Sequence, residues 1–139
     1  MRPIVGLGAG ASLGAVLRVE DLDHIVLVVA DVERSVAWYR DLLRLEVLRL
    51  QEWKDGTVPF PSVRVNAGTI IDILAGERTG TNVDHLCLAV AITDLAAVAE
   101  SGRFDVVDGP VTRWGARGLA TSLYVRDPDA NLVELRHYG

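Results

Sequence analysis

Two Asp-His pairs stand out in the sequence, because each one opens an apolar run that is typical of a buried strand. The pairs are Asp23-His24 and Asp84-His85, and they lie 61 residues apart. A carboxylate follows each histidine at nearly the same distance: Asp72 comes 48 residues after the first histidine, and Glu134 comes 49 residues after the second. Imidazole and carboxylate groups bind divalent cations such as Zn, Ni, Mn, Co and Fe. A chain that repeats this pattern in two halves can bring four donors together in one metal site.

Alternation along the predicted strands indicates which other groups share a face with these donors, because side chains two residues apart in a strand point the same way. Cys87 shares the face of His85, and Arg136 shares the face of Glu134. If both halves fold alike and the histidines point inward, both carboxylates point inward too. A single buried histidine is more often structural than a metal ligand, and the duplicated spacing is what favours a metal here.

The elements that must position these groups follow the same order in both halves: a strand, a helix and three further strands. The first half has predicted strands at 24–29, 46–53, 62–66 and 69–74, and a helix capped by Asp31. The second half has predicted strands at 83–90, 104–107, 121–126 and 132–136, a short helix capped by Thr93, a loop at 108–120 and a turn at 127–131. We expect a first βαβββ module (20–75), a linker (76–82) and a second βαβββ module (83–139), which together make one domain.

Length and composition narrow the classes of function. The chain has 139 residues, which suits a single domain, and residues 1–19 are predicted to be an N-terminal extension. The net charge of -5 argues against nucleic acid as a partner. No apolar stretch reaches the length of about 18 residues that a membrane span requires. The single cysteine fits a reducing compartment, so a cytoplasmic location is expected.

Three stretches resemble the vicinal oxygen chelate superfamily, which includes glyoxalase I, extradiol dioxygenases and bleomycin-resistance proteins. They are LDHIVLVVADVERSVAWY at 22–39, VDHL at 83–86 and SLYVRDPDANLVEL at 122–135. The stretch GPVTRWGARG at 109–118 is similar to the small virulence-type members of that superfamily. The resemblance implies an α+β fold in which the two modules form a U-shaped, partly open mixed β-sheet around a divalent metal ion, with helices on the outer face.

The resemblance also implies which residues bind the metal. Its ligand positions on the first, fifth and last strands fall on His24, His85 and Glu134, and a fourth position falls on Asp72. Glutamate or histidine is more usual at the fourth position, and aspartate is one methylene shorter, so Asp72 binds directly, binds through water or only supports the site. The superfamily prefers glycine at the position of Ala130, where alanine would be strained if φ were positive, unless the neighbouring asparagine takes the left-handed conformation.

Five further residues are candidates for contact with a substrate: Arg113, Arg117, Tyr124, Arg136 and Cys87. Each has a simpler interpretation as well. Arginines in a glycine-rich loop are often solvated, and a lone cysteine often packs as a small buried hydrophobe. His137 and Tyr138, at the end of the chain, are expected at the surface.

These observations predict a metal-dependent, glyoxalase-like enzyme of the lyase or isomerase type. Its small substrate would chelate the metal through vicinal oxygens, with Glu134 and Asp72 as the catalytic carboxylates. Two alternatives stay open: an extradiol-type dioxygenase that holds Fe(II) with two histidines and one glutamate, and a metal-free drug-binding resistance protein. Short members of the superfamily usually dimerise, so a homodimer is expected.

Overall fold

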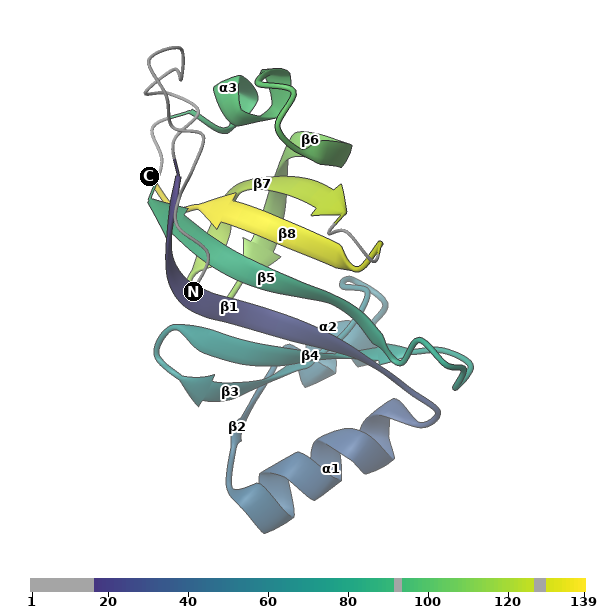
Figure 1. The fold of residues 1–139 in the computed structure, drawn as a ribbon. Helices are drawn as coiled ribbons and strands as arrows, with labels where there is room; N and C mark the ends of the chain where they lie inside the picture. The colour runs from purple at the N-terminus through teal and green to yellow at the C-terminus, as the bar shows by residue number, and fades with distance from the viewer. Residues whose placement is uncertain (1–16, 92–93, 127–129) are drawn as a thin grey trace.

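The computed structural model describes residues 17–91, 94–126 and 130–139, and within them the chain forms eight strands and three helices (Figure 1). The first half contains β1 (Arg18–Val29), α1 (Val32–Leu43), β2 (Glu46–Leu48), α2 (Leu50–Lys54), β3 (Ser62–Asn66) and β4 (Thr69–Ala75). The second half contains β5 (Val83–Ala91), α3 (Leu95–Glu100), β6 (Asp105–Gly115), β7 (Gly118–Arg126) and β8 (Leu132–His137). The predicted order of elements is present in both halves, and α2 is an additional short helix. β1 begins two residues inside the predicted extension.

Two predicted segments differ from the structure. Residues 46–53 are not one strand, because Arg49 adopts a left-handed φ of 65° that ends β2 and starts α2. The predicted loop at 108–120 is wrong, since most of it belongs to the hairpin of β6 and β7. The strand character of β6 is hard to see in the sequence because exposed residues dominate this edge strand. Gly118, at φ 96°, allows the tight turn between the two strands.

Two predictions concern the segments that lead into α3 and β8. The predicted cap Thr93 and the turn residues 127–129 lie outside the described residues. Asp94 caps α3, and its carboxylate accepts hydrogen bonds from the backbone N–H groups of the first turn. Ala130 has a φ of 65°, so the position at which the superfamily prefers glycine does require a left-handed conformation.

The strand order shows that the two halves are arranged alike. The sheet runs β2-β3-β4-β1-β5-β8-β7-β6, so each half has the same order when it is read from its edge toward the centre. β1 pairs in parallel with β4, and β5 pairs in parallel with β8, while the antiparallel β1–β5 ladder joins the halves. This open mixed sheet with few helices confirms the predicted α+β class.

The sheet is strongly curved. Arg49 follows the edge strand β2 and Trp114 lies on the opposite edge strand β6, yet the guanidinium carbon of Arg49 lies 4.0 Å from the centre of the Trp114 ring. Two edges at opposite ends of the strand order can meet only if the sheet bends around the space between them. The predicted U shape is therefore present.

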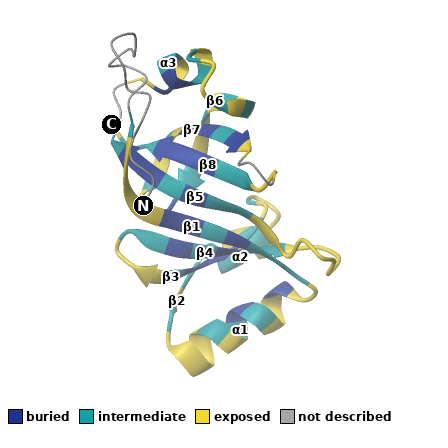
Figure 2. Cartoon of the chain, viewed as in Figure 1, coloured by how far each residue is buried: buried dark blue, intermediate teal, exposed yellow. Residues whose placement is uncertain are grey.

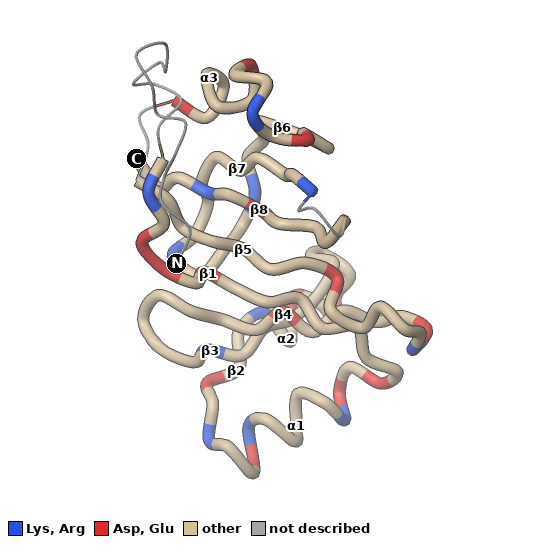
Figure 3. The backbone as a smooth tube through the Cα atoms, in the orientation of Figure 1, with Lys and Arg blue, Asp and Glu red and all other residues tan. Residues whose placement is uncertain are grey.

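The helices cover the outer face of the sheet, and the two apolar cores lie beneath them (Figures 1 and 2). Charged residues of both signs lie along α1 (Figure 3). Val32 and Val36 of α1 pack on Ile73 of β4, and α3 packs on Leu123 and Leu135. Side chains alternate along a strand, so Asp72, which precedes Ile73, and Glu134, which precedes Leu135, point to the inner face. No helix among the described residues is long and apolar enough to cross a membrane.

Candidate metal centre

Three side chains from three neighbouring strands meet on the inner face. His24 on β1 and His85 on β5 bring their Nε2 atoms to 3.3 Å from each other. Glu134 on β8 places its Oε1 atom 3.1 Å from each of these two nitrogens. The predicted metal ligands His24, His85 and Glu134 are thus brought together within one chain.

The triangle of donor atoms has the size that a divalent cation requires. Metal–nitrogen bonds of about 2.1 Å place two ligands about 3.0 Å apart in octahedral geometry and about 3.4 Å apart in tetrahedral geometry. The three separations of 3.1 to 3.3 Å lie between these values. The set of two imidazoles and a carboxylate therefore fits Zn, Fe, Mn, Ni or Co, with positions left open for a substrate.

The aspartate of each Asp-His pair orients the histidine that follows it. Asp23 accepts a hydrogen bond from Nδ1 of His24 at 2.7 Å, and Asp84 accepts one from Nδ1 of His85 at 2.7 Å. A proton on Nδ1 leaves Nε2 as a lone pair, which is the form of histidine that binds a metal. Two such lone pairs 3.3 Å apart repel each other unless a cation or a shared proton lies between them.

The role of these two aspartates is not predictable from strand alternation, because neighbours in a regular strand point to opposite faces. The pairing of β1 with β5 skips Asp23 on β1 and Asp84 on β5, so both lie in β-bulges. A bulge lets two consecutive side chains approach each other. The repeated Asp-His pair could have predicted this contact, since an aspartate beside each candidate ligand suits hydrogen bonding to imidazole.

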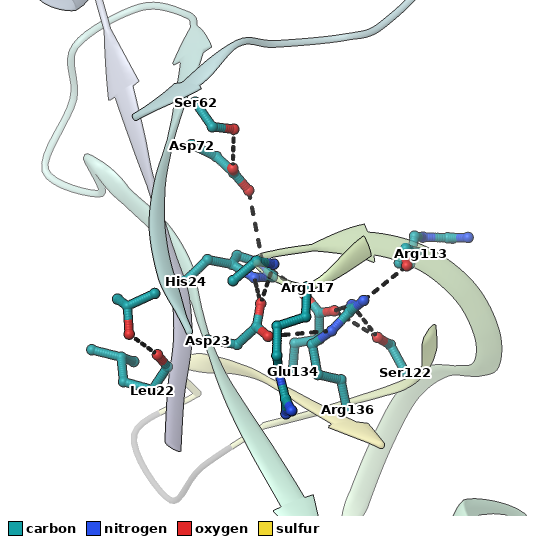
Figure 4. A network of polar contacts seen from close by, with 12 residues as sticks. Leu22, Asp23, His24, Ser62, Asp72, Arg113, Arg117, Ser122, Glu134 and Arg136 are labelled. Carbon is teal, nitrogen blue, oxygen red and sulfur yellow. Dashed lines mark hydrogen bonds and ion pairs between the residues drawn. The ribbon is translucent and has the colours of Figure 1, made fainter. Parts of the chain in front are cut away.

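The two inner carboxylates occupy equivalent positions and have equivalent serine partners, but they differ in how close they come to the triangle. Ser122 donates to Oε2 of Glu134 at 2.6 Å, and Ser62 donates to Oδ1 of Asp72 at 2.5 Å (Figure 4). Oε1 of Glu134 reaches the triangle, whereas Oδ2 of Asp72 stops 3.8 Å from Nε2 of His24. The shorter side chain of Asp72 therefore leaves it beside the triangle rather than in it.

Burial and charge move the pKa values of these carboxylates in opposite directions. Burial raises the pKa of Asp72 to about 6, although His24 and the Ser62 hydroxyl act against this. Burial also opposes ionisation of Glu134, but hydrogen bonds from His24 and His85 hold its pKa well below the usual range. Burial alone would lower the pKa of His24, but Asp23 and Glu134 outweigh it and raise the pKa to about 9. Glu134 is therefore ionised near neutral pH, whereas the pKa of Asp72 lies closer to neutrality.

Arg136 supports the triangle from behind. Its guanidinium is fully buried and donates to Oε2 of Glu134 and to Oγ of Ser122, each at 3.0 Å. Two further bonds go to the backbone oxygens of Arg113 and Gly118. Its Nε lies 3.6 Å from Asp23, so one arginine fixes carboxylates from both halves (Figure 4).

A cavity of about 370 Å³ opens onto the triangle. Its residues include four candidate donors, two arginines and several apolar or aromatic side chains: His24, Asp72, His85, Glu134, Arg49, Arg113, Pro59, Phe60, Thr112, Trp114, Leu119 and Tyr124. The predicted contacts Arg113 and Tyr124 therefore line this cavity. Burial, followed by the charge of Glu134, raises the pKa of Tyr124, so its phenol stays protonated.

Three other predicted contact residues lie away from the cavity. Cys87 is fully buried beside His24, to which its position on β5 is paired, and it serves as a small packing residue. Arg136 lies behind Glu134, and Arg117 stacks on the ring of Tyr138 at 4.0 Å. The expectation that Tyr138 is a surface residue is wrong, because its half-buried hydroxyl donates to Asp23. That contact joins positions 23 and 138, and local sequence gives no signal for it.

The fold and the inner triangle define a class of proteins built from paired βαβββ modules. The family model of the Glyoxalase/Bleomycin resistance protein/Dioxygenase superfamily matches residues 21–135. The chain belongs to this superfamily, which confirms the resemblance inferred from the sequence.

Individual proteins agree with this assignment. The chain is 28% identical over 125 residues to virulence protein STM3117 of Salmonella typhimurium, covering 86% of this chain and 85% of that protein. It is 32% identical over 127 residues to the glyoxalase domain-containing protein RDO1 of Mycosarcoma maydis, covering 88% of this chain and 70% of RDO1. The crystal structure of methylmalonyl-CoA epimerase from Mycobacterium tuberculosis is similar with a TM-score of 0.64 and 20% identity, covering 87% of this chain and 89% of that one. At that identity the likeness concerns the fold alone.

Proposed function

We propose that this chain is a metal-dependent, glyoxalase-like enzyme of the lyase or isomerase type. Its substrate is a small molecule that chelates the metal through vicinal oxygens. The observation that carries this proposal is the triangle of His24, His85 and Glu134, whose separations of 3.1 to 3.3 Å suit a divalent cation.

The side chains around the triangle have distinct roles in this proposal. His24, His85 and Glu134 would hold the ion, which supplies Lewis-acid polarisation of a carbonyl or an enediolate oxygen. Asp72 borders the cavity 3.8 Å from His24 and accepts or returns a proton at the carbon next to the polarised carbonyl. Tyr124 keeps its phenol proton and is a hydrogen-bond donor at the cavity wall.

Metal content of protein purified without an affinity tag tests the proposal. We expect near-stoichiometric divalent metal in the unaltered protein and at least roughly a tenfold loss of metal affinity in His85→Ala, since one of three ligands is removed. His137→Ala is the matched control, because this third histidine contacts the Val90 carbonyl outside the cavity. Equal metal content in all three proteins would refute the proposal.

The same measurement defines the role of Asp72. An Asp72→Asn variant is expected to retain its metal and to lose turnover, because asparagine keeps the shape and removes the proton acceptor. Loss of metal from this variant would make Asp72 a fourth ligand instead.

The extradiol-type alternative has one specific observation in its favour. Two histidines and one carboxylate on one side of a metal are the set used by non-haem Fe(II) oxygenases. Oxygen uptake by the Fe(II)-loaded protein with catechols separates the two functions, because the lyase or isomerase type consumes no oxygen.

A further inference from the structure

Two arginines lie in the cavity outside the metal triangle, and they come from corresponding parts of the two modules. Arg49 follows β2, and Arg113 lies on β6, which is the counterpart of β2 in the second module. Both line the cavity onto which His24, His85 and Glu134 open. Cations in corresponding places on opposite edges of the curved sheet face the same space.

The Arg49 guanidinium is held in place but is not neutralised. Its carbon lies 4.0 Å from the centre of the Trp114 ring and 5.9 Å from that of Phe60. Contact through the flat face leaves the N–H groups at the edge free to donate. Among the described residues, the side chain of Arg49 has no hydrogen bond or ion pair.

Arg113 is only weakly paired. One of its N–H groups donates to the Thr112 carbonyl at 2.9 Å, and another lies 3.6 Å from the exposed carboxylate of Asp108. An ion pair this long between exposed groups contributes little. The guanidinium also interacts with the Tyr124 hydroxyl, where it opposes the rise that burial causes in the pKa of that phenol. The guanidinium therefore keeps donors available for a molecule in the cavity.

The charges around the cavity favour an anion. Among the residues that line the cavity, the carboxylates of Glu134 and Asp72 would balance a bound divalent cation, which leaves the two arginines in excess. The walls of the same cavity include the aromatic and aliphatic side chains of Phe60, Trp114 and Leu119. A volume of about 370 Å³ is near the lower end of the range for small-molecule sites, about 300–1,000 Å³.

The geometry points to a carboxylate-bearing substrate, with the arginines acting as specificity-determining residues. The inference rests on the proposed metal-dependent function and adds the substrate class. The vicinal oxygens of the substrate face the metal triangle, its apolar body lies against the apolar wall of the cavity, and its carboxylate is bound by Arg49 and Arg113. The planar guanidinium fork matches a carboxylate in two-point hydrogen bonding.

Binding of paired chelators to the Zn-loaded protein tests this substrate class. Para-carboxymethyl benzohydroxamate and para-carbamoylmethyl benzohydroxamate share a chelating group and a ring, and they differ in whether the remote group is charged. We expect the carboxylate to bind roughly tenfold more tightly, since charge-assisted hydrogen bonds are about twice as strong as neutral ones. Arg49→Met and Arg113→Met should each remove most of this preference, and the neutral compound should change by less than about twofold.

Arg34→Met is the matched control, because this arginine is exposed on the outer helix α1, and it should keep the full preference. Equal binding of the two hydroxamates to the unaltered protein would overturn the inference, as would a preference that survives in the double variant.

A third probe separates this inference from the proposed metal site. Phenylacetate carries the carboxylate but no vicinal oxygens, so its binding to the metal-free protein depends on the arginines alone. Its dissociation constant, followed by NMR titration, should rise at least about fivefold in either arginine variant. A protein that binds no metal but still shows this effect keeps the anion site and loses the proposed function. If the dissociation constant of phenylacetate is unchanged in both arginine variants, the anion site itself is refuted.

Discussion

The two aspartates that orient the histidines differ in burial, although their contacts with imidazole are alike. Asp23 is buried and also accepts hydrogen bonds from the Ala116 backbone and from Tyr138, so any change there disturbs several contacts. The side chain of Asp84 is 45% exposed and bonds to His85 alone among the described residues. Asp84 is therefore the better position at which to test the effect of the carboxylate on the proposed metal site, because fewer contacts of the fold depend on it.

We expect Asp84→Asn to weaken metal binding by about 10- to 100-fold, because the carboxylate that orients His85 and increases its basicity is removed. Metal affinity from competition with a coloured chelator measures the effect. Asp105→Asn, at an exposed site on β6, is the control and should bind metal normally. An Asp84 variant with unchanged affinity would show that the hydrogen bond does not tune the ligand.

Strands in the interior of the sheet are the elements that the sequence predicts best. The predicted strands at 62–66 and 69–74 agree with β3 and β4, and the run after each histidine lies in β1 or β5. The edge of the sheet is predicted worst, because β6 exposes most of its residues and α2 depends on a left-handed arginine. The bulges at Asp23 and Asp84 are not predicted either, since a bulge is defined by the partner strand and not by its own residues.

The same reasoning explains which site residues the sequence predicts. The predicted ligands His24, His85 and Glu134 are marked by the spacing that repeats in the two modules, together with the resemblance to the superfamily. Arg49 and Tyr138 gain their roles from contacts between distant segments, for which neither spacing nor composition gives a sign.

The hairpin of β6 and β7 passes close to the buried network at Gly115. A methyl group on this glycine would lie 2.6 Å from the guanidinium carbon of Arg136 and 2.7 Å from Oδ1 of Asp23. Gly115→Ala should therefore lower the free energy of unfolding by about 1–3 kcal/mol, because the network must shift. Chemical denaturation measures this loss. Gly80→Ala, where a methyl group meets open space, should leave stability nearly unchanged, and equal stability of the two variants would contradict the prediction.

The segment that leads into β8 contains a strained alanine. Ala130 has a φ of 65°, a conformation that costs a residue with a side chain about 1–2 kcal/mol. Ala130→Gly should raise the free energy of unfolding by up to about 1 kcal/mol, after the greater flexibility of glycine in the unfolded chain is subtracted. A rise in the melting temperature would support this prediction, and a fall would refute it.

At the scale of the whole molecule, the proposed metal would join the two modules. His24 comes from the first module, whereas His85 and Glu134 come from the second. The predicted homodimer stays a prediction, and α1 exposes the apolar side chains of Trp38, Leu42 and Leu43.

The proposed metal should stabilise the fold, because a ligand that binds only the folded chain shifts the unfolding equilibrium by mass action. At a free metal concentration about 100 times its dissociation constant, the gain should be about 2.7 kcal/mol. We expect thermal melts to shift upward on addition of metal and to return on addition of a chelator. His85→Ala should show little shift, whereas a shift of equal size in that variant would place the ion elsewhere.

Asp72 and Glu134 differ by one methylene, so the two modules are not equivalent at the donor triangle. Two carboxylates of equal length would both coordinate a cation and would leave less room for a substrate. Because Asp72 is shorter, the first module contributes only His24 to the triangle, whereas the second contributes both His85 and Glu134. In the proposed function, this difference leaves a coordination position open for the substrate and places the Asp72 carboxylate beside it.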